Sequence, residues 1–237
     1  MTRRRRPGGG PTILKGKTLG RPAGNIGSET RERILQTAAA MFSLQGLRSV
    51  SLNEIAGACG MSAAAIYNYF PSKDMLFSEV VCTMYEEIAA AFTEAVRPEE
   101  GLWDCVDRIL DKCLEIYRDD GVLARLGQEA ALEAVRAPDR FPRFQVVRAR
   151  VEAIFRDAVV RGVERGELPR GADIDEMGAL ICSLVLAGIG SRSLAVPAET
   201  DFRRTVDAFR GLVRGLQGAR PGGQALSFAP DAGRQSG

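Results

Sequence analysis

Residues 51–70, SLNEIAGACGMSAAAIYNYF, constrain the fold of this chain more than any other segment. Ser51 begins a Ser-x-x-Glu capping box that ends at Glu54, and this pattern is typical of a helix N-terminus. Gly60 follows, and glycine is the residue that most readily adopts the left-handed backbone that ends a helix. Ser62 can then cap a second short helix. The segment therefore predicts two helices joined by a tight turn, a helix-turn-helix.

Small and apolar residues are spaced so that these two helices can pack closely. Ala56 has little side chain, which lets the second helix cross close to the first. The expected inward-facing residues are Leu52, Ile55, Ala56 and Cys59 on the first helix and Ile66 with Tyr69 or Phe70 on the second. A helix-turn-helix of this kind places its second helix in the major groove of DNA. The same pattern also fits an ordinary helical hairpin in an all-α core, so the segment by itself leaves both interpretations open.

The residues on either side of this segment resemble those of a known family. Upstream, apolar side chains recur at helical spacing over residues 30–45, and downstream residues 67–77 close the unit. The matching residues are Ile34-Leu35, Ala38-Ala39 and Phe42, then Gly46, Ile55-Ala56, Gly60-Met61-Ser62, Ile66-Tyr67, Phe70 and Ser72-Lys73. With these residues the run from Thr30 to Leu76, roughly a fifth of the chain, resembles the DNA-binding domain of the TetR family of bacterial transcription regulators.

Composition gives no support for catalytic chemistry. The sequence contains no histidine, which excludes Ser-His and Cys-His nucleophile pairs and His-ligated metal sites. The five cysteines are never spaced CxxC, so they are interpreted as reduced, buried thiols, with a redox switch as the less favoured alternative. These cysteines are Cys59, Cys82, Cys105, Cys113 and Cys182. No Gly-rich phosphate loop is present either. We therefore expect no enzyme activity, no cofactor and no metal site.

Charge is divided unevenly along the chain. Residues 1–33 carry nine Lys/Arg and two Glu, a net charge of +7, whereas the remainder carries −5 and the whole chain +2. A basic end on an acidic body suits a protein that presents one face to phosphates. The uncharged, mainly apolar stretch from Met177 to Ser191 is shorter than the about 20 apolar residues that span a bilayer. The Arg-rich start lacks the apolar run of a signal peptide, so we expect a cytoplasmic protein with no membrane partner.

Periodicity, capping residues and Gly/Pro breaks predict an all-α chain in four parts. The parts are a flexible basic arm (1–27), a three-helix DNA-binding domain (28–88) that contains the helix-turn-helix (51–70), a helical regulatory domain (89–217) and a disordered tail (218–237). Ser72 is the expected N-cap of a fourth helix that runs to about Val96 and connects the two domains. Further helices are expected over residues 102–117, 122–135, 141–165, 173–195 and 200–217.

The resemblance implies that the helix from Ser62 to Tyr69 reads DNA. Its early positions, which contact bases in the family, are here Ala63-Ala64-Ala65, and alanine cannot hydrogen-bond a base edge. We therefore expect modest base discrimination that depends on Asn68, Tyr69 and DNA shape, although Tyr69 fits equally well as a core aromatic. The family's phosphate contacts match Ser51, Ser62, Tyr67 and Lys73.

The basic arm offers one further DNA contact. Arg21, in Gly20-Arg21-Pro22, either enters an adjacent minor groove or belongs to a solvated tail that only raises non-specific affinity. The expected DNA-binding residues are therefore Arg21, Ser51, Ser62, Ala63, Ala64, Tyr67, Asn68, Tyr69 and Lys73.

The helices over 173–195 and 200–217 are expected to form a dimer interface. The first is apolar nearly all round, which is more than the core of one protomer requires. The resemblance implies a four-helix interface with the same helices of a second copy, and the alternative is a central buried helix of a monomer. The expected interface residues are Leu180, Ile181, Leu184, Val185, Gly188, Phe202, Val206 and Phe209.

The resemblance also implies an effector pocket among the helices between residues 72 and 165, whose occupant moves the helix that starts after Ser72. The candidate lining residues are Met84, Phe92, Trp103, Leu110, Tyr117, Gln128, Phe141 and Phe144. Each apolar candidate also fits as plain core, and the Gly127–Ala131 turn that contains Gln128 also fits as a surface turn. The absence of histidine and the scarcity of inward charge favour an apolar effector.

The expected protein is a sequence-specific, dimeric repressor that a small apolar effector of unknown identity releases from a palindromic double-stranded operator. One alternative is a DNA-binding protein without a small effector, either partner-controlled or architectural. An all-α enzyme or binding module that merely carries a helix-turn-helix is the third interpretation, and no catalytic motif supports it.

Overall fold

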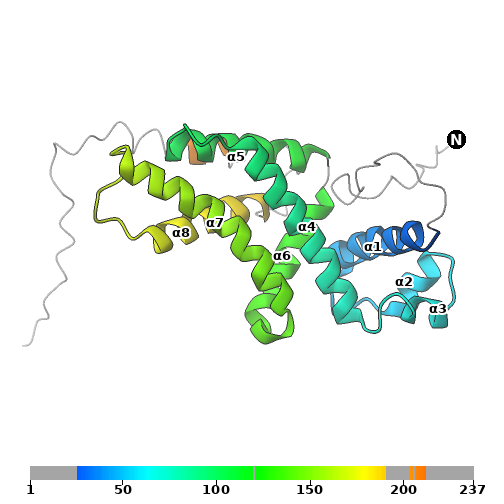
Figure 1. The fold of residues 1–237 in the computed structure, drawn as a ribbon. Helices are drawn as coiled ribbons and strands as arrows, with labels where there is room; N and C mark the ends of the chain where they lie inside the picture. Colours follow the sequence, from blue (N-terminus) through cyan, green and yellow to red (C-terminus); the bar gives the residue numbers. More distant parts are fainter. Residues whose placement is uncertain (1–25, 120, 191–202, 205, 212–237) are drawn as a thin grey trace, which may run out of the picture.

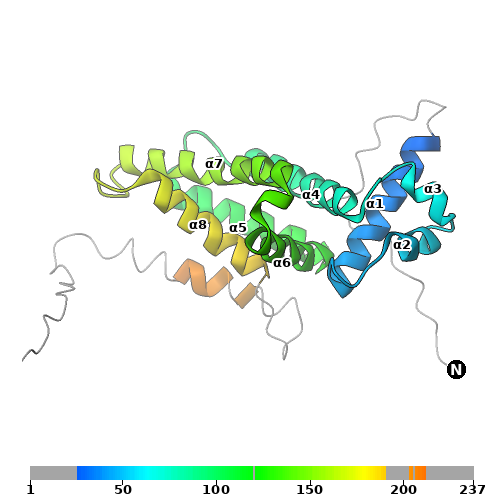
Figure 2. The same ribbon diagram turned by 90° about the horizontal axis from the view of Figure 1, so that it is seen from below.

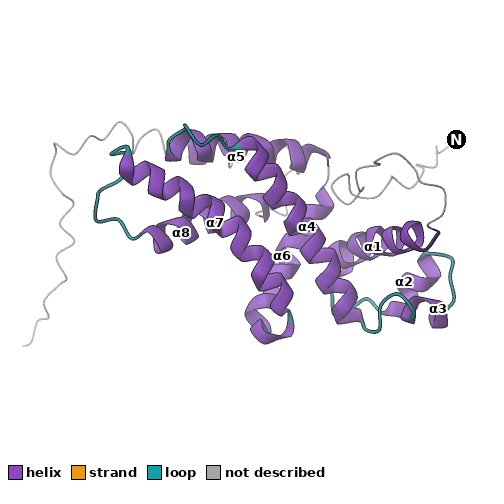
Figure 3. Ribbon diagram, viewed as in Figure 1, coloured by secondary structure: helices purple, strands orange, loops and turns teal. Residues whose placement is uncertain are grey.

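The computed structural model describes residues 26–119, 121–190, 203–204 and 206–211 (Figure 1). Within these ranges all regular secondary structure is helical (Figure 3), so the all-α prediction is confirmed. The elements in chain order are α1 (Ile26–Gln45), α2 (Leu52–Ala58), α3 (Ala63–Tyr67), α4 (Lys73–Ala95), α5 (Leu102–Asp119), α6 (Gly121–Arg136), the 3-10 helix η1 (Pro138–Arg140), α7 (Pro142–Glu164) and α8 (Ile174–Gly190). Helix α1 begins at Ile26, inside the expected arm, and the rest of the arm lies outside the described residues.

Helices α1, α2 and α3 gather at one end of the molecule (Figures 1 and 2). The capping box is present, because the amide of Glu54 donates to Ser51 Oγ (3.2 Å) and the amide of Ser51 donates to Glu54 Oε2 (2.7 Å). Gly60 has the left-handed φ of +67° that the sequence predicts, and Met61 N donates to Ala56 O at 2.9 Å across this turn. Local sequence therefore accounts for the helix-turn-helix geometry.

Helix α3 is shorter than predicted. It spans five residues and ends at Tyr67, although the sequence favoured a helix to Tyr69. The amides of Asn68 and Tyr69 donate to carbonyls three residues earlier, Ala65 O (3.3 Å) and Ile66 O (3.0 Å), which tightens the final turn. The fully buried Ile66 holds the short helix against the core.

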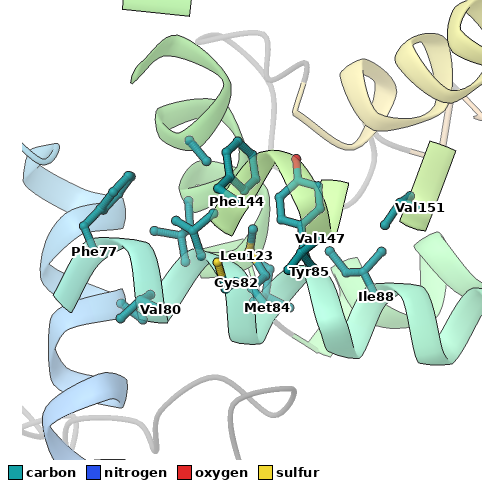
Figure 4. Packing of buried hydrophobic residues seen from close by; sticks show 14 of the residues in the cluster. Phe77, Val80, Cys82, Met84, Tyr85, Ile88, Leu123, Phe144, Val147 and Val151 are labelled. Atoms are coloured by element: carbon teal, nitrogen blue, oxygen red, sulfur yellow. The ribbon is translucent and has the colours of Figure 1, made fainter. Parts of the chain in front are cut away.

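Helix α4 connects the end that contains α1, α2 and α3 to the rest of the molecule. Ser72 caps it by accepting a hydrogen bond from Met75 N at 3.2 Å, and the helix runs unbroken to Ala95, past residue 88, the expected domain boundary. Near its start α4 packs on α1, and further along it packs on α5, α6 and α7. The buried faces of α4 and α7 meet along a row of apolar side chains (Figure 4).

Helices α5 to α8 form the second bundle. Gly178 lets α8 approach α7 closely, since a Cβ there would lie 3.0 Å from the Cα of Arg156. Residues 203–204 and 206–211 are also helical, and Arg210 fastens this segment to α5 through Asp107 (2.5 Å) and Asp111 (2.6 Å). The remainder of the two last expected helices and the tail from residue 218 lie outside the described residues. No helix among the described residues is long and apolar enough to cross a membrane.

Candidate nucleic-acid interface

The exposed face of α3 carries short, uncharged side chains. This face contains the exposed residues Ala63, Ala64 and Asn68, and Tyr67, which is 50% exposed. Ile66 occupies the opposite, buried side of the helix. The face therefore offers two methyl groups, one phenol and one amide, a set with few groups able to hydrogen-bond a base edge and one hydroxyl able to hydrogen-bond a phosphate.

Two serines at helix N-termini flank this face, and both act as caps. Ser62 Oγ accepts a hydrogen bond from Ala65 N at 3.2 Å, which leaves its hydroxyl proton free to be donated outward. Ser51 Oγ instead donates to Glu54 Oε2 at 2.7 Å, so its proton is committed within the protein. These hydrogen bonds lower the pKa of the Glu54 carboxyl group, which keeps it ionised. Of the two serines, Ser62 is thus the better placed donor to a phosphate.

Lys73 and Arg48 bring positive charge to the same end of the molecule. Lys73 Nζ donates to the carbonyl oxygen of Arg48 at 3.4 Å, which ties the start of α4 to the turn between α1 and α2. The Arg48 side chain is 68% exposed. Arg48 is not among the DNA-binding residues expected from the sequence, because a lone cation shortly before the Ser51 cap is a weak signal.

The other expected DNA-binding residues differ in their surroundings. Tyr69 is partly buried and packs against the hydrophobic core, which agrees with the interpretation as a core aromatic. Beside it, Phe70 is buried and lies under the Arg31 guanidinium, whose Cζ is 5.0 Å from the ring centroid. Arg21 lies outside the described residues. The structure therefore brings Ser62, Lys73 and the exposed face of α3 to one end of the protein.

Most candidate effector-lining residues belong to the buried core between α4, α5 and α7. The buried candidates are Met84, Phe92, Leu110, Phe141 and Phe144, and Trp103 is partly buried. Tyr85 and Phe144 meet edge-to-face with ring centroids 5.0 Å apart (Figure 4), and burial raises the pKa of Tyr85 to about 12. Gln128 is exposed instead, and its neighbour Glu129 points toward α1. The side chain of Tyr117 lies outside the described residues.

Helix α8 divides its apolar residues between two faces. Ile181 and Val185 are buried, whereas Leu180 is 54% exposed and Leu184 is 47% exposed. Val206 is buried, and Phe209 is partly buried against the core. The exposure of Gly188 and the whole of Phe202 lie outside what the structure describes. An apolar face of α8 is thus left uncovered by the described part of the chain.

Comparisons with known proteins agree with this architecture. The family model "Bacterial regulatory proteins, tetR family" matches residues 34–80, which contain most of α1, all of α2 and α3 and the start of α4. The HTH-type transcriptional regulator AcrR of Shigella flexneri is 52% identical over 52 residues, which are 22% of this chain and 24% of AcrR. The uncharacterized HTH-type transcriptional regulator YdgC of Bacillus subtilis is 33% identical over 106 residues, 43% of this chain and 54% of YdgC. The matched segments thus cover about a quarter of AcrR and about half of YdgC.

Longer but weaker matches extend into the second bundle. The HTH-type transcriptional repressor KstR2 of Mycobacterium tuberculosis is 23% identical over 157 residues, 66% of this chain and 78% of KstR2. A solved structure of a tetR-family regulatory protein from Rhodococcus RHA1 superposes with a TM-score of 0.66 at 22% identity, over 79% of this chain and 96% of that protein. At this identity the likeness establishes the fold of both bundles.

Proposed function

We propose that this chain is a dimeric transcriptional repressor of the TetR family that binds a specific operator through α3. The observation that carries the proposal is the match of residues 34–80 to the family model. This range contains α3, which is capped by Ser62, held against the core by Ile66 and exposed on its other face. Repression is the activity that the name of KstR2 gives for that relative. We propose a cytoplasmic location, where such a protein meets DNA.

In this proposal α3 enters the major groove and the surrounding residues hold the backbone. Ser62, Tyr67 and Lys73 supply hydroxyl groups and a cation to phosphates, which position the helix but carry little sequence information. Asn68 can form a bidentate contact with adenine, and the methyl groups of Ala63 and Ala64 can contact thymine methyl groups. Few base-edge hydrogen bonds are available on this face, so DNA shape contributes a large share of the specificity.

The exposed apolar face of α8 supports the proposed dimer. Leu180 and Leu184 lie one helical turn apart, and both are large apolar side chains that water surrounds in the isolated protomer. Burial of this face against the same face of a second copy would remove it from water. The resulting two-fold symmetry would set two α3 helices about one turn of DNA, 34 Å, apart and would match a palindromic operator.

Effector control would require the helices of the second bundle to move apart. An effector among α4, α5 and α7 would have to separate apolar side chains that now pack together, such as Phe92 and Phe155, whose ring centroids are 6.1 Å apart. A ligand that prefers the separated arrangement would move α4 and release DNA by differential affinity. The same close packing favours the second candidate function, a DNA-binding protein without a small effector. Ligand-dependent release from the operator distinguishes the two.

The first experiment measures binding of the purified chain to its own upstream DNA and to a scrambled duplex at about 150 mM salt. We expect about a hundredfold or greater preference for the upstream duplex. Tyr67→Ala is the matched variant, because half of this side chain is in solvent and its removal leaves the core intact. Equal, salt-sensitive binding of both duplexes would contradict a specific upstream operator, and no binding at all would contradict the proposed function.

A further inference from the structure

The end of α6, the 3-10 helix η1 and the start of α7 form a corner, residues 133–143, that reaches back to the DNA-binding end (Figure 1). The corner is held together by Glu133, its first residue, whose side chain is fully buried. Glu133 Oε1 accepts from Arg48 (3.3 Å) and Arg136 (3.1 Å), and Oε2 accepts from Arg140 (3.3 Å). A buried carboxylate requires such partners, because an uncompensated charge is strongly unfavourable away from water. Arg48 therefore joins the α1–α2 turn to this corner.

Arg140 also grips the first turn of α4. Its Nε donates to Asp74 Oδ2 at 2.8 Å and its Nη2 donates to Asp74 Oδ1 at 2.5 Å, a bidentate pair. Asp74 follows Lys73 directly, at a helix N-terminus where a carboxylate is favourable. One guanidinium thus links the buried carboxylate of Glu133 to the segment of α4 that carries Lys73.

A second carboxylate on α6 holds the α1–α2 turn. Glu129, one helical turn before Glu133, accepts from Leu47 N at 2.7 Å. It lies close to Gly46, where an added Cβ would be 3.2 Å from Glu129 Oε1 and where φ is +79°. The α1–α2 turn therefore has no side chain that would separate it from α6 at this point.

Apolar and ionic contacts continue the junction along α4. The ring centroids of Phe141 and Phe77 are 5.4 Å apart, and those of Phe77 and Phe42 of α1 are 5.3 Å apart. Glu79 joins Arg143 of α7 (2.5 Å) to Arg31 of α1 (3.1 Å). The corner thus holds the α1–α2 turn through Arg48 and the first part of α4 through Asp74, Phe77 and Glu79, whereas the proposed DNA-reading residues lie on and around α3.

We propose that Arg140 is a positioning residue for operator binding, which fixes the orientation of α1–α3 and the start of α4 relative to the regulatory helices. The proposal rests on the function proposed above. In a dimer the two α3 helices must match a fixed groove spacing, so an orientation that is already set avoids an ordering penalty when DNA binds. Arg140 acts through Asp74 and Glu133 and touches no DNA itself.

The test compares Arg140→Gln with the matched control Arg156→Gln. The control makes the same charge change but breaks an ion pair between α7 and α8, Arg156–Asp175 at 3.2 Å, away from the junction. Binding is measured to a duplex recovered by selection from a random pool and to a scrambled duplex. We expect Arg140→Gln to lower the operator preference about five- to tenfold, at the low end of coupling between sites, and Arg156→Gln to leave it unchanged.

A distance measurement separates positioning from a simple loss of charge. Spin labels are attached at Ala58→Cys on α2 and Asp104→Cys on α5, both exposed positions, and the labelled chain is diluted with unlabelled protein. The five native cysteines are buried. We expect the distance distribution to be narrow in the parent, broader in Arg140→Gln, and still broader than the parent in Arg140→Lys, because lysine keeps the charge but cannot make the bidentate pair with Asp74 and reach Glu133 at once.

An unchanged distribution in Arg140→Gln overturns the proposal, even if operator affinity falls, because Arg140 then acts through charge alone. Equal effects of Arg140→Gln and Arg156→Gln overturn it as well. If the parent chain prefers no duplex, the proposed function fails, and the distance distribution still decides whether Arg140 sets the orientation.

Discussion

The surroundings of Glu87 on α4 disfavour the ionised form of its carboxyl group, and this makes the free energy of unfolding depend on pH. Its Oε2 atom is buried and has no hydrogen-bond partner within the described part of the chain. Burial raises the pKa of Glu87 from the ordinary 4.5 to about 7, and the nearby carboxylates of Glu32 and Glu86 add to this effect. The ionised form is thus disfavoured in the folded state, and Glu87→Gln should stabilise the protein at high pH.

The magnitude follows from the two pKa values. The difference between 4.5 and about 7 corresponds to about 3.4 kcal/mol at 1.36 kcal/mol per pKa unit. Because the side chain is only half-buried, solvent screening reduces this to about 1–2 kcal/mol. The folded state binds the proton more tightly than the unfolded state, so the penalty is absent below pH 4.5, grows between pH 4.5 and 7, and is complete above pH 7.

Urea denaturation at pH 5 and pH 8, at one protein concentration, measures the effect. We expect Glu87→Gln to raise the free energy of unfolding by about 1–2 kcal/mol at pH 8 and by less than about 0.5 kcal/mol at pH 5. Glu94→Gln, on the exposed side of the same helix, is the matched control and should change it by less than about 0.5 kcal/mol at both pH values. An equal gain for Glu87→Gln at both pH values would mean that the gain is independent of ionisation, and that burial of the Glu87 carboxylate does not destabilise the protein.

Three further variants test other parts of the molecule. Leu184→Arg places a charge on the exposed face of α8, and we expect a folded monomer with weak operator binding; sedimentation that still reports a dimer would place the interface elsewhere. Asn68→Ala should reduce the discrimination between operator and scrambled duplexes by about 1–3 kcal/mol, measured as the ratio of the two Kd values, and an unchanged ratio would exclude Asn68 as a base reader. Ser51→Ala removes the capping box of α2 and should lower the free energy of unfolding by about 1 kcal/mol in urea at pH 7, whereas no loss would mean that the cap is dispensable.

The features that the sequence predicted correctly depend on residues close together in the chain. The Ser51 capping box, the left-handed turn at Gly60 and the Ser72 cap of α4 each involve groups within five residues of one another. Helix periodicity is local in the same way, so the helices could be placed to within a few residues. The end of α3, at Tyr67 rather than Tyr69, falls within this margin.

Contacts between distant segments could not be predicted in this way. Arg48 and Glu133 are separated by 85 residues and Arg140 and Asp74 by 66, and no local pattern selects one arginine of this Arg-rich chain over another. Helix α8 is apolar nearly all round, so its periodicity could not say that Ile181 would be buried while Leu180 would face solvent.

Short-range hydrogen bonding and periodicity specify the helical segments and their caps, so amino-acid order was enough to predict them and to mark α1, α2 and α3 as the expected DNA-binding end. Three features became visible only in the folded protein: the carboxylates that hold the α1–α2 turn, the leucines that remain exposed and the aromatic residues that pack together as core. Those outcomes depend on how whole helices cross one another, and this is a property of the complete packing of the chain.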